Sequence, residues 1–136
     1  MSDFDFEAVV PEVERLWQHW SEHLGLQNWR VLVRTSSDMD GGVLGVSWPV
    51  GYRKVALDIN TKQETPEIEL AGEHLILNVL HETVHVAMSS LWEYGMEEVG
   101  GQKSITWAMF RTAQERDVDT LTSIIWRLHE QTGCKL

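Results

Sequence analysis

Two histidines and a glutamate stand close together in the stretch His81-Glu82-Thr83-Val84-His85, which has the pattern H-E-x-x-H. On a helix, His81 and His85 would share one face, because residues four apart lie one above the other. Two imidazoles at that spacing can bind one metal ion, normally zinc. Glu82 would project beside that face, where it can act as the general base for a water that the metal activates.

The pattern lies within an apolar segment, residues 72–90, that is expected to form a helix. No Pro or Gly occurs from Glu73 to Ser90, and apolar residues surround the pattern on nearly every side, as in a helix buried in the core. Burying two histidines and a glutamate without partners would be costly, and a metal ion removes that cost. The alternative is a helix with two partly exposed histidines and no metal.

A catalytic zinc site usually has three protein ligands and one open position, so a third ligand is needed. The predicted final helix, residues 105–131, contains Glu115 and Asp119, which are four apart and share a face. Glu115 is the candidate third ligand. Asp119 is the candidate carboxylate that accepts a hydrogen bond from the outer nitrogen of a ligating histidine and so orients its ring.

Other acidic residues compete for this role. Glu97 and Glu98 could supply a ligand, although they lie in a segment that is expected to be a loop. Asp117 points to another face of the helix. Glu115 itself could instead be an exposed partner of Arg111, four residues before it.

The other histidines are expected to lie outside this site. His74 is seven residues before His81, about 10 Å along the helix axis, so a solvated or capping role is expected. His129 lies about 21 Å along the final helix from the candidate third ligand. His19 and His23 are also four apart and make a weak second metal pair, but a polar helix face is the expected role.

The composition indicates one globular domain over residues 1–136, with 43% hydrophobic residues. The net charge of −10 would repel phosphate backbones and anionic membrane surfaces, so neither nucleic acid nor a membrane is an expected partner. A protein or peptide is the expected partner, and a basic one would be attracted.

Cysteine usage and the N-terminal segment bear on the compartment. Cys134 is the single cysteine, which excludes an intrachain disulfide and a cysteine zinc cluster. Residues 1–7 are acidic and do not have the pattern of a secretory signal. No segment is long and apolar enough to span a bilayer. The chain is therefore expected to be cytoplasmic.

The hydrophobic pattern predicts an α+β fold, in which an antiparallel or mixed sheet of three strands packs on helices. Pro11 should lie in the first turn of the first helix, and Gly25 should end that helix. The expected elements are a helix over 6–24, strands over 29–34, 43–48 and 52–60, a connection over 61–71 with a turn after Pro66, the helix over 72–90, a loop over 91–103 and the helix over 105–131.

With these residues in place, the chain resembles the zincin metallopeptidases, and within them the gluzincins. In that arrangement H-E-x-x-H on one helix is completed by a Glu from a later helix in the pattern E-x-x-x-D, which here corresponds to His81, Glu82, His85, Glu115 and Asp119. The chain is also similar to small zincin-like domains of phages and bacteria, including the SprT-like and ImmA/IrrE-type groups. The similarity in layout covers most of the chain, but only H-E-x-x-H is specific.

The departures from related groups limit what the resemblance implies. No third histidine follows His85 at the metzincin spacing, and the lone cysteine excludes the zinc ribbon of some SprT-like proteins. The acidic charge argues against a DNA-dependent protease.

The resemblance implies a hydrolase, a zinc metalloprotease in which Glu82 takes a proton from water and passes it to the leaving amine. The strand over 52–60 would then form the upper edge of the cleft, where an extended substrate could add as a further strand. Tyr52 and Tyr94 are candidates for a second electrophile. Two alternatives stay open: a zincin-fold interaction or regulatory module with little or no proteolytic activity, and a domain that needs zinc only to fold.

Overall fold

The computed structural model of the chain describes residues 3–47, 53–89, 105–133 and 136. Within these residues the order is a short 3-10 helix, one α-helix, three strands and three further helices. Their bounds are η1 Glu7–Val9, α1 Val10–His23, β1 Arg30–Ser36, β2 Leu44–Ser47, β3 Lys54–Asn60, α2 Pro66–Glu69, α3 Gly72–Ala87 and α5 Ile105–Thr132.

The chain divides into two compact units, and the division falls inside helix α3. Residues 1–83 with Leu136 form the first unit, which holds α1, the sheet, α2 and most of α3. Residues 84–135 form the second unit, which holds the end of α3 and all of α5. The expectation of one domain stays a prediction.

Helix α1 follows the predicted periodicity and ends where the sequence indicated. Pro11 lies in its first turn, and Gly25, with φ +75°, follows its last residues. The amide of Leu26 donates to the carbonyl of Ser21, five residues earlier, at 2.7 Å. This is the 6→1 hydrogen bond of a Schellman C-terminal motif. The predicted apolar stripe is buried in its centre, at Val13, Leu16, Trp17 and Trp20.

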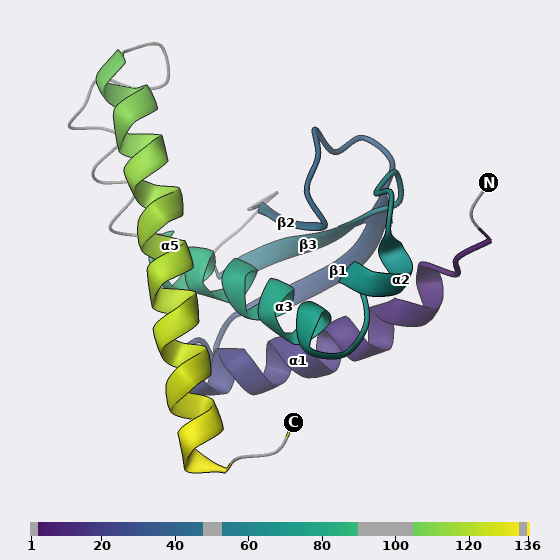
Figure 1. The fold of residues 1–136 in the computed structure, drawn as a ribbon, viewed down its shortest axis with the longest axis horizontal. Helices are drawn as coiled ribbons and strands as arrows, with labels where there is room; N and C mark the ends of the chain where they lie inside the picture. Colours follow the sequence, from purple (N-terminus) through teal and green to yellow (C-terminus); the bar gives the residue numbers. More distant parts are fainter. Residues whose placement is uncertain (1–2, 48–52, 90–104, 134–135) are drawn as a thin grey trace. The chain divides into compact units, whose positions relative to one another are not determined.

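The three strands form a mixed sheet in the order β1-β3-β2 (Figure 1). Strand β3 pairs in parallel with β1 and antiparallel with β2. Arg34 of β1 is opposite Asp58 of β3, and the two side chains form an ion pair that supports this register. The hydrogen bond to Asp58 raises the pKa of the Arg34 guanidinium above its ordinary value.

The central position of β3 corrects one expectation. The strand predicted over 52–60 was expected to form the free edge of a cleft, and this is wrong, because β3 has a partner strand on each side. Its sequence is consistent with the central position: Val55, Ala56, Leu57 and Ile59 are all buried. A strand buried on both faces is typical of the middle of a sheet. The strand at the antiparallel edge is β2.

Helix α3 carries the H-E-x-x-H residues. It ends at Ala87 and so is shorter than the predicted range 72–90, of which Ser90 lies outside the described residues. Leu75, Val79, Leu80 and Val84 are at most 4% exposed, so the expected burial in the core is confirmed for one side of the helix. Its first three residues are exposed and both motif histidines are half-buried, so the helix is not buried on nearly every side.

The remaining segments agree with the sequence in outline. Helix α2 is the turn expected after Pro66, and α5 ends next to Gly133, whose φ is +69°. The loop expected over 91–103 lies outside the described residues. Among the described helices, none has both the length and the apolar character that crossing a membrane requires. The α+β class with a three-stranded mixed sheet is confirmed.

The burial of α3 predicts that truncation of a leucine there lowers the free energy of unfolding more than truncation of an exposed leucine elsewhere. Leu80→Ala should lower the free energy of unfolding by about 2–5 kcal/mol, because Leu80 is 0% exposed and its loss leaves a cavity. Leu32→Ala is the matched control: Leu32 is 57% exposed on β1, and its truncation should cost within about 1 kcal/mol. Urea denaturation measures both values. Equal losses at the two positions would contradict this burial.

Candidate metal centre

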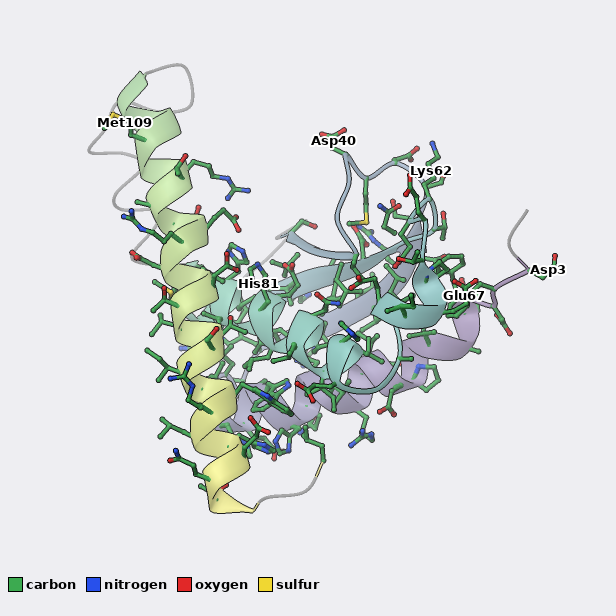
Figure 2. The ribbon with its side chains drawn as sticks, viewed as in Figure 1. Asp3, Asp40, Lys62, Glu67, His81 and Met109 are labelled. Carbon is green, nitrogen blue, oxygen red and sulfur yellow. The ribbon has the colours of Figure 1, made fainter. Side chains whose placement is uncertain are left out.

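Helix α3 places His81 and His85 on one face. Around them, Thr83, Val84 and Val86 are buried, whereas His81, Glu82 and His85 are half-buried. The polar residues of H-E-x-x-H therefore lie at the boundary of the buried face, where they can meet a ligand. Figure 2 shows His81 on α3.

The hydroxyl of Thr83 does not compete for a ligand in this arrangement. Thr83 is 0% exposed, and its Oγ1 donates to the carbonyl oxygen of Val79 at 2.7 Å. This hydrogen bond satisfies a polar group that would otherwise be buried without a partner. The middle of the motif, Thr83 and Val84, therefore packs in the core. The two histidines and Glu82 are the side chains of the motif that remain available to a ligand.

Helix α5 brings the predicted third ligand to His85. Glu115 Oε1 lies 3.5 Å from His85 Nε2, within the unit that holds both residues. The side chain of His85 is 11% exposed and that of Glu115 is 41% exposed, so the pair lies at the surface of its unit. Together, His81, His85 and Glu115 form a group in which one ligand atom from each lies within 4.8 Å of the others.

The chemistry of this donor set fits a zinc ion. Ligand atoms at 2.0–2.1 Å from a tetrahedral ion stand about 3.3 Å apart. The 3.5 Å between His85 Nε2 and Glu115 Oε1 is close to that value, and all three ligand atoms lie within 4.8 Å of one another. Two neutral imidazoles and one carboxylate carry one negative charge. Because they supply three ligand atoms, the fourth position of a tetrahedral ion would stay open. The group could hold a metal ion.

Glu115 also has the partner that the sequence offered as an alternative. Arg111 Nη2 lies 3.5 Å from the same oxygen, Glu115 Oε1, and Arg111 Nη1 donates to Gln114 Oε1 at 2.9 Å. Pairing with Arg111 and metal ligation were expected as rival roles of Glu115, whereas the structure brings both Arg111 and His85 to the same carboxylate oxygen. The four-residue spacing of Arg111 and Glu115 was the available signal. It could not show that the Glu115 oxygen near Arg111 also lies near His85.

The other candidate residues have different outcomes. Asp119 lies one turn after Glu115 and is exposed, and its role in orienting a histidine stays a prediction. Asp117 is exposed on α5, as expected for an ordinary surface carboxylate. The remaining candidates, Glu97 and Glu98 as rival ligands and Tyr52 and Tyr94 as electrophiles, lie outside the described residues.

The remaining histidines lie outside the metal group among the described residues. His74 is exposed in the first turn of α3, which agrees with the expected solvated role. His129 is 8% exposed, and its ring stacks on Trp126 with centroids 5.7 Å apart. It is a packed residue of α5. His19 and His23 lie together near the end of α1.

Comparisons with protein-family models, curated proteins and solved structures find no match to this chain.

Replacement of the third ligand should weaken metal binding. Glu115→Gln should reduce zinc affinity by at least about 100-fold, because it removes the charged ligand. Loss of a group that only orients a ligand costs about 10–100-fold in affinity, and loss of the ligand itself should cost more. Asp117→Asn is the matched control, since it removes one carboxylate two residues along the same helix. Elemental analysis and competition with a chelator measure the effect. Full zinc content in Glu115→Gln would show that another residue is the third ligand, and Glu97 and Glu98 would be tested next.

The supporting role of Asp119 has its own test. Asp119→Asn should lower zinc affinity by about 10–100-fold if the carboxylate orients a ligating ring. The same titrations measure it, with Asp117→Asn again as the control for surface charge. An affinity equal to that of the control would identify Asp119 as a surface residue.

Proposed function

We propose that this protein is a zinc-dependent metallopeptidase that acts in the cytoplasm and hydrolyses peptide bonds of a narrow set of protein or peptide substrates. The observation that carries the proposal is the convergence of His81, His85 and Glu115, with Glu82 on the same helix as the two histidines. This is the ligand set and the base that the gluzincin resemblance implies.

Each residue of the group has a distinct role in this chemistry. Zinc held there would polarise the peptide carbonyl and lower the pKa of water at the open position. Glu82 accepts the proton of the attacking water at its carboxylate and then donates it to the leaving amine. His81 and His85 supply neutral nitrogen donors, and Glu115 supplies the one charged ligand.

Glu82 favours catalysis over a metal that only supports folding. A structural zinc site is closed by four protein ligands, whereas three ligand residues are grouped among the described residues. A half-buried carboxylate next to a ligating histidine costs desolvation, and a purely structural site gains nothing from it. The alternative of an interaction module with little or no proteolytic activity shares the metal group and differs only in whether Glu82 is used.

The sheet supports one mode of substrate binding. Strand β2, at the antiparallel edge, replaces the strand over 52–60 as the place where an extended peptide could add as a further strand. Main-chain hydrogen bonds would then provide affinity that depends little on sequence. The net charge of −10 favours a cationic peptide over an anionic one at low ionic strength.

The test is a comparison of two glutamate variants on α3 with a peptide library as substrate. Glu82→Gln should lower the cleavage rate by about 100- to 10,000-fold while zinc content is unchanged, because it removes the base and keeps the ligands. Glu73→Gln is the matched control: Glu73 is exposed in the first turn of the same helix, and its replacement should leave cleavage unchanged.

The readout should cover many sequences, because a narrow substrate range would leave a generic casein assay silent. Mass spectrometry of new termini in a proteome-derived peptide library meets this need. Cleavage that persists equally in Glu82→Gln would exclude this site as its source. A zinc-loaded wild type that cleaves nothing in the library would support the interaction module instead.

A further inference from the structure

A second histidine pair lies at the end of helix α1, in the unit that holds the sheet. His19 and His23 are four residues apart, and their ring centroids are 4.4 Å apart with the ring planes tilted by 35°. His23 is exposed and His19 is half-buried. The pair therefore faces solvent, with its two imidazoles side by side instead of splayed apart.

The hydrogen bonding of His23 determines which of its nitrogens can bind a metal. His23 Nδ1 lies 2.8 Å from the carbonyl oxygen of His19. A carbonyl can only accept, so Nδ1 carries the proton, and in the neutral ring Nε2 then holds the lone pair. Ligating histidines in metal sites commonly use this arrangement, in which one nitrogen donates to a carbonyl while the other binds the ion.

The surroundings hold this pair in place. The His19 ring contacts Trp20 edge-on with centroids 4.8 Å apart, and Trp20 is 1% exposed. The His23 ring approaches the same indole, with centroids 6.2 Å apart. Both imidazoles therefore rest on a side chain anchored in the core, which reduces the rotamer entropy that metal binding would cost.

The electrostatics of the helix end favour a cation. His23 is the last residue of α1, and the Schellman motif at Gly25 follows it. Carbonyl groups at a helix C-terminus carry partial negative charge, which stabilises a nearby cation. The net charge of −10 acts in the same direction at low ionic strength.

We infer that His19 and His23 form a second metal site, which binds a borderline transition-metal dication such as Cu²⁺, Ni²⁺ or Zn²⁺. The two nitrogens come from the imidazoles, and water completes the coordination. Cu²⁺ should bind most tightly, following the usual order of affinities for nitrogen donors. With two protein ligands and an open solvent side, the site exchanges its ion readily, unlike a closed structural site.

The experiment uses the full chain with its first centre disabled. In a His81→Ala/His85→Ala background, Cu²⁺ and Ni²⁺ are titrated by calorimetry, and tryptophan fluorescence is followed in parallel, because a paramagnetic ion beside Trp20 quenches its emission. We expect one equivalent to bind. Adding His19→Gln or His23→Gln should weaken the affinity for this equivalent at least tenfold and abolish the quenching of tryptophan emission.

Matched controls separate the outcomes. His74→Gln removes another exposed histidine and should leave the titration unchanged. If the double-alanine background does not fold, the same glutamine substitutions are compared in the zinc-loaded wild type, where the site appears as an additional equivalent. Titrations that are identical with and without His19→Gln and His23→Gln, or an equal loss in His74→Gln, would overturn the inference. Neither result depends on whether the chain is a peptidase.

Discussion

The constraint on which the candidate centre depends is that one helix must bury an apolar face and present polar side chains on another. Helix α3 has Val79, Leu80 and Val84 at no more than 2% exposure, yet it must present two imidazoles and a carboxylate. A helix meets both demands because its period of 3.6 residues separates the two faces. The buried face determines the rotation of the helix about its axis, and the positions of His81 and His85 follow from that rotation.

The charge of the centre follows from its ligands. A dication held by two neutral imidazoles and Glu115 would leave one net positive charge, which an ionised Glu82 carboxylate would offset. Arg111, beside Glu115, adds positive charge next to the ligand carboxylate. At 41% exposure of Glu115 that pair is screened by solvent and is worth little to stability. Its effect would be local, because Arg111 lies 3.5 Å from the carboxylate oxygen of Glu115 that a bound metal ion would also use.

Local patterns in the sequence predicted local structure well. The spacing of Val13, Leu16, Trp17 and Trp20 identified α1, Gly25 identified its end, and the spacing of His81 and His85 identified the shared face. Element ends differ by one to a few residues, because terminal turns depend on contacts that periodicity does not describe.

Non-local structure was harder to predict, for a physical reason. A short connection makes β2 and β3 antiparallel neighbours, but the parallel pairing of β1 with β3 joins strands that are not consecutive in the chain. No local pattern specifies that pairing, so the wrong strand was expected at the edge. Glu115 was identifiable only as one of several acidic residues, since thirty residues separate it from His85 and chain spacing does not determine that distance.

The two histidine pairs show that spacing alone does not define a metal site. Both pairs are four apart on a helix, but His85 has a carboxylate within 3.5 Å from a second helix, whereas His23 has a backbone carbonyl of its own helix at 2.8 Å. An anionic third ligand adds charge and one more bond to the ion, which favours tight binding and leaves one position for chemistry. A carbonyl at the outer nitrogen only orients the ring. The carboxylate therefore distinguishes the two pairs: in the proposals above, the α3 group would retain its ion and keep one position open, whereas the α1 pair would exchange its ion.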